Sequence, residues 1–144
     1  MKILMADDDL DDQLIASLAF KKLNLAHSLD FVDDGEELIN YLLEKIRTVQ
    51  PFPDLILLDL NMPRKDGRAA LNEIKTNPEL KHLHVIVFST SDSQKDIDES
   101  MSHGANRYIV KKSTYHELME IFTSISETVV TQPGWHYQIP ARPR

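Results

Sequence analysis

Acidic side chains follow two short apolar runs of this chain. The run Ile3–Ala6 ends in Asp7 and Asp8, and the run Leu55–Leu58 ends in Asp59. Carboxylates that are packed together repel one another, and at least one takes up a proton unless a cation compensates the charge. A hard divalent cation such as Mg²⁺ prefers carboxylate and carbonyl oxygens, so it would resolve this repulsion. The acids therefore predict a magnesium site.

Two further apolar runs end in groups that complement these acids. His84–Phe88 is followed by Ser89 and Thr90, and Tyr108–Val110 is followed by Lys111. The lysine supplies a second positive charge, and the serine hydroxyl supplies a hydrogen bond. Together with the acids, these groups are suited to binding a phosphoryl group and to forming an acyl phosphate on one aspartate. Asp59, which follows the predicted central strand, is expected to be the working residue of this site.

These groups can act together only if the strands are parallel neighbours. Leu55–Leu58 is an uninterrupted aliphatic run closed by Pro63 and Gly67, which is typical of a strand buried on both faces of a parallel sheet. Five such runs alternate with five helical patterns, so we expect an α/β fold with a doubly wound, five-stranded parallel sheet. In such sheets the ligand site lies at the carboxyl ends of the strands.

The helical patterns have distinct apolar faces. The first places Leu10, Leu14, Ile15 and Leu18 on one face, and the helix after Gly35 has a predicted buried stripe. The third ends near Asn77-Pro78, the fourth is predicted over Gln94–Ser102, and Thr114 with Glu117 matches a capping box for the last. The buried stripe of the second helix comprises Leu38, Ile39, Leu42, Leu43 and Ile46.

The bulk properties of the chain limit the functions to consider. Its 144 residues fit one domain, predicted over residues 1–130, and the three prolines after Thr131 indicate an irregular tail over 131–144. A formal charge of −7 argues against nucleic acid or an anionic membrane surface as a partner. The absence of cysteine excludes disulfides and thiolate metal sites. We expect a cytoplasmic monomer or small oligomer without a membrane span.

Four motifs, taken together, resemble the receiver domain of two-component response regulators over roughly residues 2–127. Any one motif would be weak evidence, but four in this order and spacing are specific. The resemblance implies a flavodoxin-like receiver fold. The motifs are Ile3-Leu-Met-Ala-Asp7-Asp8-Asp9, Leu57-Leu-Asp59-Leu-Asn61-Met-Pro63 with Asp66-Gly67, Val87-Phe-Ser89, and Gly104-Ala105 with Tyr108-Ile-Val-Lys111.

The resemblance also implies a role for each matching residue. Asp59 would accept a phosphoryl group from a histidine kinase or a phosphotransfer protein, and the chain would catalyse only its own phosphorylation and dephosphorylation. Asp8, Asp59 and the backbone carbonyl of Asn61 would bind Mg²⁺, with Asp7 helping through water. Ser89, Thr90 and Lys111 would contact the phosphoryl group, and Tyr108 would be the switch aromatic.

The resemblance extends to partners. The segment Pro63-Arg-Lys-Asp-Gly67 and the proline-flanked stretch before Leu55 look like the stand-alone regulators that serve bacterial phytochromes. A phytochrome-like kinase would then be the phosphodonor, and the output would be an encounter with another protein, or a homodimer.

Two positions depart from the family pattern. Thr90 stands where a small residue is usual, which would crowd the phosphoryl pocket or narrow access for a phosphatase. Lys112 replaces a proline whose preceding peptide bond is commonly cis in the family, and without proline the cis form costs about 3 kcal/mol more. Either the site holds a strained bond, or the loop runs differently here.

Two other functional classes stay open at this point. An aspartyl phosphohydrolase of the haloacid dehalogenase type needs a second aspartate two residues after the nucleophile, where this chain has Asn61. A pseudo-receiver, which binds partners without phosphorylation, typically lacks one of the acids or the lysine. Here Asp7, Asp8, Asp59 and Lys111 are all present.

Overall fold

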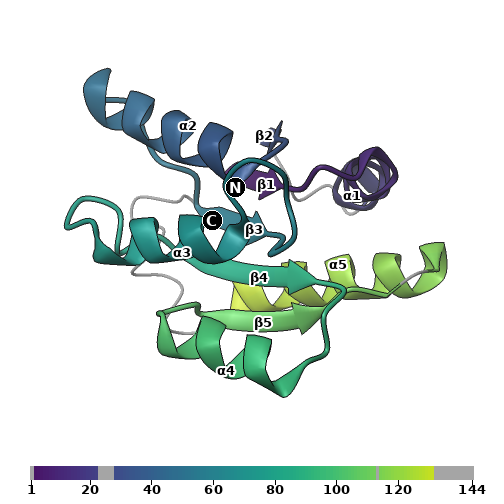
Figure 1. Cartoon of the computed structure of the whole chain (residues 1–144). Coiled ribbons are helices and arrows are strands. Elements are labelled where there is room, and N and C mark those ends of the chain that lie inside the picture. Colours follow the sequence, from purple (N-terminus) through teal and green to yellow (C-terminus); the bar gives the residue numbers. More distant parts are fainter. Residues whose placement is uncertain (1, 23–27, 113, 132–144) are drawn as a thin grey trace.

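A computed structural model describes residues 2–22, 28–112 and 114–131 of the chain. Five strands form a single parallel sheet of order β2-β1-β3-β4-β5, and five helices alternate with them (Figure 1). This confirms the predicted doubly wound, flavodoxin-like fold. The strands are β1 (Lys2–Ala6), β2 (Ser28–Val32), β3 (Leu55–Leu58), β4 (Val85–Ser89) and β5 (Arg107–Val110). The helices are α1 (Leu10–Lys22), α2 (Gly35–Arg47), α3 (Gly67–Thr76), α4 (Gln94–Ser102) and α5 (Tyr115–Thr131).

The helices bury both faces of the sheet, so the central strand β3 is buried along its whole length. Helices α2 and α3 contribute to one core cluster, and α1 and α5 contribute to the other. The second cluster is organised by aromatic packing, since the rings of Phe20 and Phe88 both lie within 5.4 Å of the ring of Phe122, centroid to centroid. Burial on both sides explains why β3 is a continuous aliphatic run.

The exposed face of α1 is the main surprise in the fold. Leu10, Leu14 and Leu18, which the helical pattern groups on one face, are 73%, 60% and 46% exposed. The buried residues of this helix are instead Ala16, Ala19 and Phe20, and Ile15 is only half-buried. The small alanines allow the helix to lie close to the sheet, while Phe20 supplies the large apolar surface.

The other helices follow their predictions closely. Leu38, Ile39 and Leu42 are buried in α2, but Leu43 is 44% exposed, so the predicted stripe is narrower than expected. Helix α4 has the predicted bounds; its buried residue is Ser100, and Met101 is 43% exposed.

Helix ends are stabilised as the sequence indicates. The N-cap bond of the predicted capping box of α5 forms, because the Glu117 amide donates to Thr114 Oγ1 at 3.2 Å. The Thr114 hydroxyl also donates to the Glu117 carboxylate, at 2.8 Å. Helix α5 extends to Thr131. The rest of the predicted tail lies outside the described residues.

Candidate functional site

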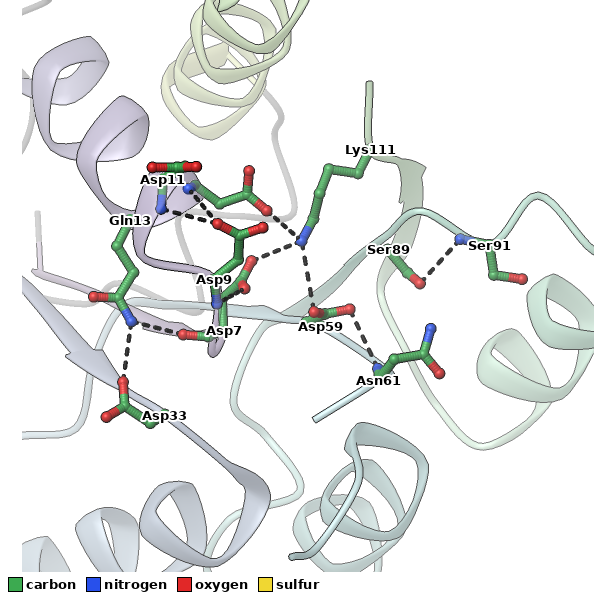
Figure 2. Close-up of polar contacts among 11 residues, drawn as sticks. Asp7, Asp9, Asp11, Gln13, Asp33, Asp59, Asn61, Ser89, Ser91 and Lys111 are labelled. Atoms are coloured by element: carbon green, nitrogen blue, oxygen red, sulfur yellow. Dashed lines mark hydrogen bonds and ion pairs between the residues drawn. The ribbon is translucent and has the colours of Figure 1, made fainter. Parts of the chain in front are cut away.

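The polar residues that follow the strands converge at the carboxyl edge of the sheet (Figure 2). One carboxylate oxygen each from Asp7, Asp8 and Asp59 lies within 4.8 Å of the others. Asp7 and Asp59 are buried, whereas Asp8 is exposed. Ladder-type hydrogen bonds fix the backbone at both buried acids: the Asp7 amide donates to the Val32 carbonyl, and the Asp59 amide donates to the Ala6 carbonyl, each at 3.0 Å. The predicted cluster of acids is therefore present.

Lys111 brings a cation into this cluster from the end of β5. Its ammonium group is 2.7 Å from Asp7 Oδ2 and 3.5 Å from Asp59 Oδ2, and it lies 5.3 Å from the centre of the Phe88 ring. The Lys111 amide donates to the Ser89 carbonyl at 2.6 Å, which continues the pairing of β5 with β4 beyond the strand.

The peptide bond that joins Lys111 to Lys112 is trans, because the described residues contain no cis peptide bond. Of the two alternatives for this loop, the chain without proline adopts a different course rather than the family's cis bond. The lysine nevertheless reaches the acids.

Burial and charge set the protonation of the cluster. Burial raises the pKa of Asp7 to about 6, although Lys111 and the Asp9 amide partly offset the effect. Burial likewise raises the pKa of Asp59, against the opposing attraction of Lys111. Burial disfavours the ammonium form of Lys111, but the carboxylates around it outweigh that cost and raise its pKa. At both buried acids, burial and the attraction of Lys111 therefore act on the pKa in opposite directions.

The donor set fits a hard divalent cation. Three convergent carboxylates, one of them open to solvent, are oxygen ligands of the kind that Mg²⁺ and Mn²⁺ take in proteins. Burial raises the pKa of both buried acids, and Lys111 only partly offsets that effect. The backbone of Asn61 lies beside the Asp59 carboxylate, since the Asn61 amide donates to Asp59 Oδ1 at 3.3 Å.

The loop after Asp59 is held close to it by a glycine. A Cβ atom on Gly67 would lie 2.1 Å from the carbonyl oxygen of Asp59, so no larger residue fits without moving the backbone. The Gly67 amide donates to the Leu60 carbonyl at 2.8 Å, and the Asp66 carboxylate caps α3 by accepting from the Ala69 amide at 3.0 Å. The predicted Asp-Gly pair thus anchors the helix beneath the acid.

The two predicted hydroxyl residues differ in their exposure. Ser89 is fully buried and its Oγ accepts from the Ser91 amide at 3.2 Å, whereas Thr90 is exposed. The hydroxyl of Tyr108 donates to the Ser91 carbonyl at 2.7 Å, so the half-buried ring is turned toward the β4–α4 loop.

Several polar residues of the site were not singled out from the sequence. Asp12 in α1 forms a second close ion pair with Lys111, at 2.8 Å. Gln13 donates to the Asp7 carbonyl at 2.6 Å and to Asp33 at 3.1 Å. No local signal distinguishes Asp12 from its neighbour Asp11, because both are acids in the first turn of the same helix.

A second set of polar contacts that the sequence did not indicate joins α3 to the β4–α4 loop. Arg68 pairs with Asp96 at 2.9 Å, and the Asp96 carboxylate accepts from the Ser91 hydroxyl at 2.5 Å. Because Ser91 also accepts from Tyr108, this chain of contacts connects the loop beyond Ser89 to two helices and to β5.

Known proteins are similar to this chain in sequence and in fold. The family model of the response regulator receiver domain matches residues 3–123. Response regulator Rcp1 from a Synechocystis species is 35% identical over 124 residues, which is 85% of this chain and 84% of that protein. The crystal structure of the Mn²⁺-bound form of Rcp1 superposes with a TM-score of 0.82 at 33% identity, covering 92% of this chain and 96% of that one.

Two further solved structures are similar. The phosphorylated cyanobacterial phytochrome response regulator RcpA has a TM-score of 0.84 at 37% identity, covering 90% of this chain and 94% of that one. Response regulator RPA3017, from red light signalling of R. palustris, has a TM-score of 0.76 at 34% identity, covering 98% and 95%. The relatives thus include regulators from light signalling, one solved with a metal ion and one solved phosphorylated.

Proposed function

The chain belongs to the response regulator receiver domain family, and from this premise we propose that it is a phosphorylation-dependent switch whose phosphoacceptor is Asp59. The observation that carries the proposal is the convergence of Asp7, Asp8 and Asp59 with Lys111 at one edge of the sheet. The set is complete, which favours phosphorylation over the alternative of a pseudo-receiver that only binds partners.

In the proposed reaction, a carboxylate oxygen of Asp59 attacks the phosphorus of a phosphohistidine on a kinase or phosphotransfer protein. A phosphorus–oxygen bond forms as the phosphorus–nitrogen bond breaks, and the histidine leaves with the electron pair. Lys111, which already lies 3.5 Å from Asp59, stabilises the charge that gathers on the phosphoryl oxygens. The Ser89 hydroxyl would donate a hydrogen bond to one of those oxygens.

Asp8, Asp59 and the carbonyl of Asn61 would hold the cation, with Asp7 acting through water. A bound Mg²⁺ would supply charge neutralisation between the carboxylates and the incoming phosphoryl group. The exposed Asp8 is the acid that solvent reaches, so a cation would approach the buried pair from its side.

The switch would act through the β4–α4 loop. Phosphorylation adds a group that carries a charge of about −1.5 to −2. This charge would attract the Lys111 ammonium group, and the Ser89 hydroxyl would move to form a hydrogen bond with it. Ser91 follows Ser89 and accepts the Tyr108 hydrogen bond, so a shift of this loop would change the position of Tyr108. The surface formed by α4, β5 and α5 would report that change to a partner protein or to a second copy of the chain.

The similarity to the phytochrome response regulator RcpA and to a regulator from red light signalling supports a phytochrome-like histidine kinase as the donor. No helix within the described residues is long and apolar enough to span a membrane. We place the protein in the cytoplasm, where such a kinase domain would meet it, and we assign it no nucleic-acid partner and no turnover of an external substrate.

The decisive experiment is incubation with Mg²⁺ and acetyl phosphate, followed by intact mass measurement. We expect a single, slowly lost phosphoryl group on the wild-type chain, and none on Asp59→Asn. The matched control is Asp98→Asn, which makes the same charge change on an exposed residue of α4 and should label normally. Absence of label on the folded wild-type protein would favour the pseudo-receiver, and repeated turnover of phosphate esters would favour the phosphohydrolase.

A further inference from the structure

Lys111 has one more carboxylate partner than the proposed phosphotransfer requires. Its ammonium group lies 2.7 Å from Asp7 Oδ2, 2.8 Å from Asp12 Oδ2 and 3.5 Å from Asp59 Oδ2. Asp7 and Asp59 belong to the acidic cluster, whereas Asp12 comes from the first turn of α1 and is not part of it. The lysine and Asp12 side chains are only 5% and 13% exposed, so water screens their pairing weakly.

The distances show which carboxylates accept hydrogen bonds from the Lys111 ammonium group. It donates hydrogen bonds to Asp7 and Asp12. Its separation from Asp59 lies at the limit of a hydrogen bond, and Figure 2 shows the lysine between Asp7 and Asp59. Asp12 therefore draws the lysine toward α1 and away from the acceptor. During phosphoryl transfer, negative charge gathers on oxygens beside Asp59, and the lysine must redirect a hydrogen bond to them.

We propose that Asp12 is a positioning residue that restrains Lys111 and thereby slows phosphorylation of Asp59. The inference rests on the proposed function, because it assigns a rate-setting role within the same reaction. Asp12 competes with the transferring phosphoryl group for the lysine, so removing its charge while keeping an oxygen acceptor should release the lysine and speed the transfer.

The test compares Asp12→Asn with Asp11→Asn in the full chain. Asparagine keeps a side-chain oxygen to accept from Lys111 but carries no charge. Asp11 is the matched control because it is an exposed acid of the same helical turn, so its replacement changes the net charge and the helix terminus in the same way. Among the described residues, the carboxylates paired with Lys111 are those of Asp7, Asp12 and Asp59, and Asp11 is not one of them.

The rate of phosphorylation by acetyl phosphate with Mg²⁺ is measured for each variant, with folding verified by circular dichroism. We expect Asp12→Asn to be phosphorylated about threefold to tenfold faster than Asp11→Asn, as removal of one poorly screened charge pair implies. The conservative variant Asp12→Glu should remain slow. An Asp12→Asn rate equal to or below that of the control overturns the inference.

A second comparison separates competition from a merely structural role. In a Lys111→Met background, replacement of Asp12 should no longer change the residual rate, because the two residues act on the reaction as one unit. An acceleration that persists without the lysine would contradict the mechanism. Failure of the wild-type chain to label at all would instead contradict the proposed function, so the two failures are distinguishable.

Discussion

Two lysines at opposite edges of the sheet show how different surroundings assign different tasks to the same side chain. Lys111 lies at the carboxyl edge among carboxylates, and its pKa is raised. Lys75, in the last turn of α3, lies at the amino edge, where its ammonium group donates to the carbonyls of Leu83 at 2.6 Å and Lys81 at 3.2 Å, and to Asn106 Oδ1 at 3.2 Å. Burial lowers its pKa, because these neutral partners do not compensate the lost hydration.

The difference separates a functional edge from a structural one. Lys75 satisfies backbone oxygens and joins the end of α3 to the segments that precede β4 and β5. Lys111 is a single ammonium group among three carboxylates, those of Asp7, Asp12 and Asp59. We therefore expect the site to bind a further cation, and Lys111 to pair with a phosphoryl group. Variants at the two edges should therefore separate stability from activity.

The largest effect is expected for Lys111→Met. Removal of the buried cation leaves Asp7, Asp12 and Asp59 to repel one another, which should cost about 3 kcal/mol of unfolding free energy in urea titrations without metal. Added Mg²⁺ should restore stability more in this variant than in the wild type, and phosphorylation should fall strongly. Lys112→Met, at an exposed neighbour, is the control. A Lys111→Met protein as stable as that control would contradict the account of this edge.

A smaller and purely structural loss is expected for Lys75→Met. The methionine fills similar space but leaves carbonyl groups without their donor, which should cost about 2 kcal/mol of unfolding free energy. Phosphorylation by acetyl phosphate should stay within about twofold of wild type under conditions where the protein is folded. Lys81→Met, which removes an exposed lysine beside it, should leave stability unchanged. A selective loss of phosphorylation in Lys75→Met would break the division between the edges.

The smallest effects are expected from pH, and they should have opposite signs at the two edges. At the amino edge, burial and the charges of Lys75 and Arg107 lower the pKa of His84 to about 4. As the pH falls from 6.5 to 4, the unfolded chain binds a proton there that the folded chain does not, so stability is lost. At the carboxyl edge the pKa of Asp7 is raised to about 6, so between pH 6 and 3.8 the folded chain binds the extra proton and stability is gained as the pH falls.

Urea titrations at pH 7 and pH 5 in the presence of a chelator measure both contributions. Relative to wild type, His84→Gln should lose less stability on acidification, and Asp7→Asn should lose more, each by about 1 to 2 kcal/mol. Equal pH responses of the two variants would show that the edges do not differ in this way.

Much of this architecture could be predicted from local patterns. The aliphatic run Leu55–Leu58 has the same bounds as β3, and the bounds of α4 match as well. Parallel pairing then places Asp7, Asp59 and Lys111 at one edge, because strands that run in the same direction end on the same side. The parallel direction of the strands was therefore enough to predict that residues about a hundred positions apart lie at one edge.

The side-chain contacts between helices could not be predicted from the local sequence pattern. The leucines of α1 form a regular apolar face, yet the face that packs is the one with Ala16, Ala19 and Phe20. Spacing identifies a helix, but the shape of the sheet and of α5 decides which face fits, and here Phe20 meets Phe122.

The sequence by itself determined the strands, the acids that follow them and the lysine that completes the predicted site. Only the tertiary structure decided that this lysine is shared with Asp12, that Thr90 is exposed, and that Tyr108 is turned toward Ser91. The physical reason is that the positions of the strands follow from periodicity and their parallel direction from the alternation with helices, whereas the partner of a charged side chain depends on ångström-scale distances that packing alone sets.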